Sequence, residues 1–468
     1  MRGDERAAAG FGGRLGAGWW WCIARAVSGL MFAAVAALAA RGSTADELLP
    51  SYEAPTVALG AFELQPTLTA IGAAFVESNP WYGEPEANVG GDADRWFEGS
   101  VEAGFNGVLG LGGYGAAYGT LTALGQATRG GLDLAGSNLD ERDTEDLAIG
   151  QAFAGWRSGD LFGALGEDAV DLSIGRQNYF VGTGFLIGDG AADGGERGAY
   201  WIGRDAFDLA GIARLQTGGL LAEGFYLAPD DDPDTGTEVA GVNLEYAIGE
   251  AATVGATYLN VVDSDLAARD GMNVFDVRAS ATPVPALLPG LLLAGEFAYE
   301  DNGGELEAYG YYGEVGYEFG EAPWTPYLSY RYAFFSGDDP DSGESEDFDP
   351  LFYGFEDWGT WFQGEILGEF ALANSNLISH TVRLRAQPTE AVTTNLLYHY
   401  FRLDEPEALG VTSDNFAHEV NLIVDWTLSG NLLLTGVAGV TVPEDGAEEY
   451  TGGNDTWAHF MLAATLSF

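Results

Sequence analysis

The sequence contains no lysine and only one cysteine. All 19 basic residues are arginine, against 71 Asp and Glu, so the formal net charge at pH 7 is −52. An acidic chain of this kind repels nucleic acid, and we expect no nucleic-acid partner. The one cysteine, Cys22, lies near the N-terminus. The rest of the chain therefore has no disulfide framework, zinc–thiolate site, iron–sulfur cluster or thiol nucleophile.

Long apolar runs are also missing after residue 45. The richest stretch, 287–294, is interrupted by Pro289, so the pattern excludes a bundle of membrane helices. Hydrophobic residues nevertheless make up 47% of the chain, with 26 Phe and 21 Tyr. This composition is compatible with a membrane β-barrel, whose strands each carry only a weak hydrophobic signal.

The N-terminal segment has the features of a targeting peptide. Several arginines precede an apolar stretch, 26–39, that is too short to cross a membrane as a helix. We expect residues 1–45 to be a signal peptide cleaved after Ala45, with cleavage after Ala39 as the alternative. Residues 46–468 are then expected to form a single domain.

The chain ends on an aromatic residue in an alternating segment, 458–468. Phe460, Leu462, Leu466 and Phe468 fall on one face, and smaller or polar residues fall on the other. This ending resembles the C-terminal signal read by the barrel-assembly machinery of the bacterial outer membrane, which we expect as a partner. We expect this last strand to pair with the first strand, near residues 62–76, and so close a barrel.

The same period of two recurs along the chain. Alternating segments include 237–248, 253–258, 306–319, 325–335, 361–370 and 376–387. Since barrels of this type carry an even number of strands, we predict an all-β, transmembrane, antiparallel up-and-down barrel of eighteen strands, with sixteen as the alternative.

Connection lengths alternate as well. Short connections are expected at 249–250, 388–389 and 429–430, and long ones at 125–144, 179–204, 229–236, 336–358 and 443–454. Tight turns at one rim and long loops at the other are typical of outer-membrane barrels. We therefore expect an outer-membrane protein surrounded by lipid and lipopolysaccharide.

Charged residues in the strands fall on the face opposite the apolar one. Arginine facing lipid at the bilayer midplane costs about 2–4 kcal/mol, so a water-filled lumen is favoured. We expect the following residues to line the pore: Arg278, Arg331, Arg383, Arg385, Glu314 and Glu365. One hypothesis is that the arginines bind carboxylates or hydroxyls of a passing solute; the alternative is an internal ion-pair network that supports the wall.

Arg176 is a further pore-lining candidate that breaks this pattern. It shares the parity of the apolar residues Leu172 and Ile174. A bulge, or the end of the strand, must therefore turn its side chain toward the other face.

Two acidic turns and four histidines complete the candidate residues. Oxygen-rich turns could hold Ca²⁺, with weak candidates Asp230, Asp232, Asp234, Asp339 and Asp341, although solvated acidic loops are commoner and no other cofactor is expected. The histidines are isolated in strands, and no ordered nucleophile–base arrangement is present. The sequence therefore predicts a protein that is not an enzyme.

Two stretches resemble the alginate export family of outer-membrane barrels. The first is Leu172-Ser173-Ile174-Gly175-Arg176-Gln177, followed by a Gly/Asp-rich loop and Ala206-Phe207-Asp208-Leu209-Ala210. The second is Phe348-Asp349-Pro350-Leu351-Phe352-Tyr353-Gly354, followed by Trp358-Gly359-Thr360-Trp361. The resemblance implies an eighteen-stranded barrel that passes an anionic exopolysaccharide through an arginine-lined constriction. The acidity and the lack of lysine depart from that family picture.

The leading expectation is thus a passive channel for an anionic exopolysaccharide, working with a periplasmic polysaccharide export complex. A general diffusion porin for small sugars or ions is the alternative. An outer-membrane hydrolase is less well supported, because the chain shows no nucleophile motif.

Overall fold

The computed structural model describes residues 54–91, 94–130, 143–191, 201–202, 204–232, 234–354 and 363–468. The expected signal peptide and both cleavage sites lie outside these residues. Within these ranges, no helix is long and apolar enough to cross a membrane.

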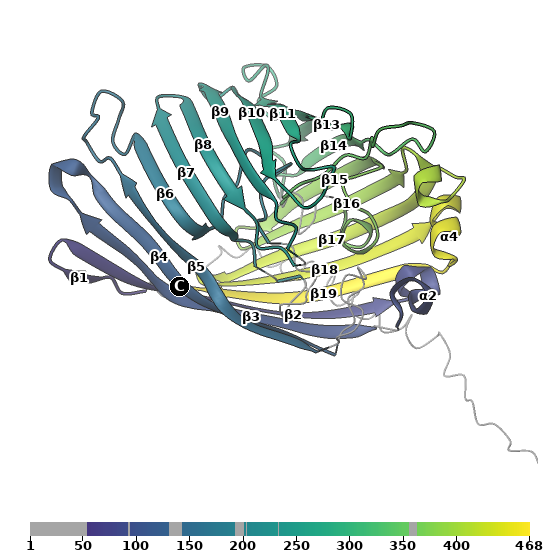
Figure 1. Cartoon of the computed structure of the whole chain (residues 1–468). Helices are drawn as coiled ribbons and strands as arrows, with labels where there is room; N and C mark the ends of the chain where they lie inside the picture. The colour runs from purple at the N-terminus through teal and green to yellow at the C-terminus, as the bar shows by residue number, and fades with distance from the viewer. Residues whose placement is uncertain are drawn as a thin grey trace, which may run out of the picture. The chain divides into compact units, whose positions relative to one another are not determined.

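The domain is built from β-strands that each pair antiparallel with their neighbours in sequence (Figure 1). In chain order the strands are β1 (Val57–Leu59), β2 (Phe62–Ser78), β3 (Arg95–Gly110), β4 (Ala116–Arg129), β5 (Thr144–Arg157), β6 (Val170–Gln177), β7 (Phe207–Thr217), β8 (Leu220–Ala228), β9 (Glu238–Ile248), β10 (Ala252–Asp263), β11 (Asn273–Ala281), β12 (Leu291–Asp301), β13 (Glu307–Glu318), β14 (Tyr327–Phe335), β15 (Leu377–Thr389), β16 (Val392–Arg402), β17 (Asn415–Ser429), β18 (Leu432–Pro443) and β19 (Trp457–Ser467).

The last strand closes the sheet on itself. β19 pairs with β2 from Ala458 opposite Ser78 to Ser467 opposite Thr69. The short β1 pairs only with the first residues of β2, so the closed ring consists of the eighteen strands β2 to β19. The predicted strand number, the closure and the outer-membrane barrel fold are confirmed. A ring without free edges satisfies the backbone hydrogen bonds that lipid cannot.

Side chains alternate between the two faces of the ring. On β11, Phe275 and Val277 are 51% and 55% exposed, whereas Val274 and Asp276, which alternate with them, are buried. The exposed apolar face is the one that lipid covers, because water-facing strands of a barrel wall would not collect large apolar residues. The buried, more polar face lines the lumen.

Most connections are shorter at one end of the ring than at the other. Only two residues separate β15 from β16 and β17 from β18. At the other end, short helices lie in the long connections: η1 (Pro80–Gly83), α2 (Pro85–Val89), α3 (Leu367–Phe370), η3 (Pro406–Leu409) and α4 (Asp445–Thr451); η2 (Gly112–Tyr114) lies in a turn. The two longest connections are the β6–β7 loop (178–206) and the β14–β15 loop (336–376).

One predicted strand is wrong. The segment 361–370 forms a turn followed by helix α3 in its described part, 363–370. Ile366 and Phe370, which suggested one face of a strand, are four residues apart and also share a helix face. Both are buried, so the apolar pattern records burial inside the barrel and not contact with lipid.

Candidate functional site

The β6–β7 loop crosses the lumen. At one point, Thr183 Oγ1 donates a hydrogen bond to Glu296 Oε2 of β12 (2.5 Å). Further along, the backbone N–H groups of Trp201 and Ile202 donate to Glu98 Oε2 of β3 (2.8 and 3.1 Å). Since β3 and β12 lie nine strands apart in a ring of eighteen, a loop bound to both must span the interior.

The β14–β15 loop binds to the β6–β7 loop. Gly188 N and Asp189 N both donate to Phe352 O (2.7 and 3.0 Å), and Phe352 N donates to Leu186 O (3.0 Å). Nearby, Phe185 packs against Phe348, with ring centroids 5.9 Å apart. The two loops therefore form one hydrogen-bonded unit with its own apolar core inside the ring.

Carboxylates of the wall hold the β14–β15 loop by its backbone. Glu419 of β17 is fully buried and accepts hydrogen bonds from Ile366 N (3.0 Å) and Leu367 N (2.9 Å). Gly364 approaches the same carboxylate with φ +95°, and a Cβ there would lie 2.5 Å from Glu419 Oε1, so only glycine fits. On the other side, Asp349 N donates to Glu300 of β12 (2.8 Å).

Helix α3 places a carboxyl group among other carboxyl groups. Burial raises the pKa of Glu369 well above its ordinary value, and Glu365 and three wall glutamates add to the shift. Those wall residues are Glu98, Glu77 and Glu419. A buried group in such surroundings favours its protonated form. Glu365, predicted on a strand facing the pore, lies instead in the turn before α3 and is 2% exposed.

Arg278 of β11 lies on the lumen face, and its side chain is held on several sides. Its guanidinium pairs with Asp276 and Glu245 at 2.7 Å each and donates to Thr257 Oγ1 (2.9 Å) and to Asn243. The side chain is 8% exposed. Arg278 is therefore joined to three strands of the wall, β9, β10 and β11, by ion pairs and hydrogen bonds.

Arg331 and Glu314 face each other across β14 and β13. Arg331 Nη2 donates to Glu314 Oε2 (2.8 Å), and Tyr327 Oη donates to Oε1 (3.0 Å). The guanidinium also lies 4.5 Å from the ring centre of Tyr312, a favourable cation–π distance. Both predicted residues are therefore in the lumen wall, in contact with one another.

The two arginines of β15 differ in exposure. Arg383 is 7% exposed and donates from Nε to Asn395 Oδ1 (2.9 Å). Arg385 lies closer to the turn end of the strand; its side chain is 40% exposed and pairs with Glu318 (3.2 Å). Of these pore-lining candidates, Arg385 is thus the most open to a passing solute.

The structure contains the bulge that the parity of Arg176 required. The β6–β7 register shifts between Gly175 and Gln177. Arg176, which the shift leaves out of the β6–β7 pairing, forms ion pairs with Asp208 (3.0 Å) and with Asp230. Arg176, a candidate pore-lining residue, is therefore in contact with Asp230, a candidate calcium ligand.

The acidic turns use their carboxylates for protein contacts. Asp230 contacts arginine; Asp234 Oδ1 accepts from Gly236 N (2.8 Å), and Asp339 Oδ1 accepts from Asp341 N (2.9 Å). Asp232 is half-buried in the same connection as Asp230. No group of three or more His, Cys, Asp or Glu in the described part of the chain is placed to hold a metal ion.

Three residues that organise the site were not predicted from the sequence. Glu98 and Glu419 hold the loops, and their only sequence signal is an acidic residue at an inward position of an alternating strand. Arg204 lies in the β6–β7 loop and pairs with Asp230 (3.0 Å) and Asp146. A loop arginine has no periodicity, so no pattern could have identified it.

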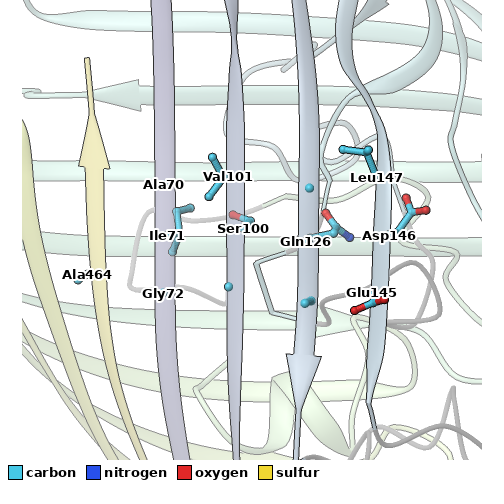
Figure 2. Close-up of a pocket in the computed structure, with 13 residues that line it drawn as sticks. Ala70, Ile71, Gly72, Ser100, Val101, Gln126, Glu145, Asp146, Leu147 and Ala464 are labelled. Atoms are coloured by element: carbon cyan, nitrogen blue, oxygen red, sulfur yellow. The ribbon is translucent and has the colours of Figure 1, made fainter.

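A shallow depression of about 790 Å³ lies across β19, β2, β3, β4 and β5 (Figure 2). Small residues meet there in register: Ala464 opposite Gly72, Gly72 opposite Gly99, and Gly99 opposite Ala127. Val101 and Leu147, which also line it, are 50% and 79% exposed. The depression therefore belongs to the lipid-facing surface and not to the lumen.

Comparisons with solved structures show the same fold. The chain is similar to Pseudomonas aeruginosa OpdK, solved with vanillate (12% identity, TM-score 0.55), and to OccK9 (OpdG) of the same organism (14% identity, TM-score 0.55). It is also similar to Acinetobacter baumannii OccAB4 (12% identity, TM-score 0.51). Each match covers 86% of this chain and 98% of the other. No curated protein matches the sequence.

The family model described as alginate export matches residues 108–435. That range runs from β3 to β18 and contains both lumen loops and the predicted arginines. With the eighteen-stranded ring and the alternating faces, this match shows that the chain belongs to the alginate export family of outer-membrane channel proteins.

Proposed function

We propose that this protein is a passive channel for a hydrophilic solute that carries carboxylates, with an anionic exopolysaccharide as the leading case. The observation that carries the proposal is the lumen itself. Two joined loops narrow it, and guanidinium groups lie in its wall. Guanidinium binds carboxylate through paired hydrogen bonds.

The family description and one similar structure support a solute that carries carboxylates. The matching family model is described as alginate export, and alginate is a polymer of uronic acids. OpdK was solved with vanillate, which is also a carboxylate. We propose that a solute carboxylate exchanges with the protein's own carboxylates on the arginines, without covalent chemistry. We further propose contact with lipopolysaccharide, and a periplasmic export complex as the source of the polymer.

A general diffusion channel for small sugars or ions is the second candidate. It is favoured by charge compensation, because Arg278, Arg331 and Arg385 each already pair with a carboxylate. A wall compensated in this way attracts anions weakly at physiological ionic strength.

Reversal potentials in planar bilayers under a KCl gradient test the proposal. We expect the purified barrel to prefer anions, and Arg383→Ala/Arg385→Ala to lower that preference. Arg402→Ala/Arg129→Ala is the matched control, since these arginines lie at strand ends and pair with Asp414 and Glu145. Unchanged preference and conductance in the first double variant would remove its arginines from the function. A cation-preferring wild type that still swells liposomes with sugars would favour the second candidate.

A further inference from the structure

Two arginines from separate parts of the chain converge on a single oxygen atom. Arg176, at the end of β6, and Arg204, in the β6–β7 loop, both contact Asp230 Oδ2; the Arg204 Nη1 distance is 3.0 Å. Asp230 comes from a third element, the β8–β9 connection. The three side chains are only 7–12% exposed. Such a convergence is the geometry of a carboxylate-binding site.

Each arginine is also held by groups other than Asp230. Arg176 pairs with Asp208 (3.0 Å) and donates from Nε to Gly150 O (3.0 Å). Arg204 pairs with Asp146 of β5. The two guanidinium groups therefore keep their positions and a counter-charge when Asp230 leaves, so the pair is preorganised for another carboxylate.

The backbone of Asp230, in the β8–β9 connection, is hydrogen-bonded to the β6–β7 loop that crosses the lumen. Asp230 N donates to Gly190 O (2.7 Å), and Gly190 N donates to Asp205 O (2.9 Å). Burial raises the pKa of Asp205, the residue after Arg204. The nearby Glu102 adds to this shift, and a hydrogen bond from Asn178 partly opposes it. The surroundings are thus poorly hydrated, which strengthens contacts between guanidinium and carboxylate.

We propose that Arg176 and Arg204 form a binding site for a carboxylate of the transported solute, and that Asp230 occupies this site until the solute displaces it. This inference rests on the proposed function, because it specifies where the carboxylate binds. Exchange of one carboxylate for another leaves the number of ion pairs unchanged. The solute therefore binds without being trapped, as conduction requires.

The probe is glucuronate, a monomeric uronate, added to single channels in planar bilayers at constant ionic strength. In Asp230→Asn the competing carboxylate is removed, so we expect half-block at a glucuronate concentration about tenfold lower than in the wild type, as for one charge-assisted hydrogen bond. Asp234→Asn is the matched control. It removes the same charge from the same connection, but Asp234 is exposed and its side chain accepts a hydrogen bond from Gly236 N (2.8 Å) within the turn.

Two further variants test whether the change in glucuronate block comes from binding at the arginine pair and not from a change in surface charge or in folding. Asp230→Glu keeps a competing carboxylate at this position, so we expect half-block near the glucuronate concentration of the wild type. Asp230→Asn/Arg204→Gln removes half of the arginine pair and should lose the tenfold gain. Heat-modifiable mobility on gels verifies that each variant is a folded barrel.

The inference would be overturned if Asp230→Asn and Asp234→Asn were half-blocked at the same glucuronate concentration. It would also be overturned if Asp230→Asn/Arg204→Gln were still half-blocked at the tenfold lower concentration. If the wild type is blocked by glucuronate and only these variant effects are absent, the inference fails alone. If glucuronate blocks neither the wild type nor any variant while sugars still pass, the carboxylate specificity of the proposed function fails as well.

Discussion

Glu419 offers the sharpest test of how the lumen is narrowed. Its buried carboxylate accepts from Ile366 N on one oxygen and from Leu367 N on the other, at 3.0 and 2.9 Å. Glu419→Gln keeps the shape but replaces one oxygen with an NH₂ group, which cannot accept. One backbone N–H of the β14–β15 loop then faces a donor, in a place closed to water.

The expected cost follows from that single lost contact. An unsatisfied buried donor costs about 1–3 kcal/mol, which corresponds to a shift of roughly 5- to 150-fold in the equilibrium between the bound and released loop. Glu419→Ala removes both contacts and should shift the equilibrium further in the same direction. The barrel itself should stay folded, because its ring of strand pairs does not involve this carboxylate side chain.

Two measurements report the released loop. Single-channel recordings should show larger or more frequent openings, and chymotrypsin should cleave near Phe370 faster than in the wild type. Glu448→Gln is the control, since Glu448 lies exposed on α4. A folded Glu419→Gln barrel with wild-type conductance, noise and cleavage rate would show that the carboxylate does not hold the loop.

Three further predictions concern two residues of the wall and one of the β14–β15 loop. Arg278→Ala leaves Asp276 buried without its guanidinium, so we expect a loss of about 3–5 kcal/mol of unfolding free energy, measured by urea unfolding in detergent; a loss below 1 kcal/mol would contradict this. Burial and neighbouring carboxyls raise the pKa of Glu369, so the bound loop takes up a proton and gains stability as pH falls from neutral toward the ordinary value of 4.5. Channels should accordingly close more at pH 5 than at pH 8, and Glu369→Gln should weaken that dependence; an unchanged pH profile would remove Glu369 as its cause. Leu384→Arg, on the lipid-facing side, should cost roughly 2–4 kcal/mol if it lies near the midplane, and equal stability to wild type would contradict the assigned face.

The fold could be predicted because its rules are local. Alternation with a period of two identifies each strand and both of its faces, and an up-and-down barrel needs nothing more than strand number and order. The ends of β9 and β14 were placed to within two residues by this pattern alone. The misassigned segment 361–370 shows the limit, because apolar residues spaced by four fit a helix and a strand alike.

The site could be predicted only where it lies on strands. Parity placed Arg278 and Arg331 in the lumen wall, and the mismatch of Arg176 indicated a bulge. The contacts that narrow the lumen depend on where two long loops settle, and their anchors are backbone N–H groups that every residue carries. No side-chain pattern in 178–206 or 336–376 records such anchors, so the roles of Glu98 and Glu419 could come only from the structure.

The acidity and the lack of lysine have a common structural explanation in the lumen. Arg278 pairs with two carboxylates, and so does Arg176; Arg204 does the same and shares Asp230 with Arg176. A planar guanidinium presents five donors in fixed directions and can serve two carboxylates at once, whereas an ammonium group is a compact point charge. Another wall carboxylate, Glu419, accepts hydrogen bonds from the backbone N–H groups of Ile366 and Leu367 and from the side-chain amide of Asn421. An excess of carboxylates over basic residues is therefore compatible with a well-bonded interior, provided that the basic residues are arginine.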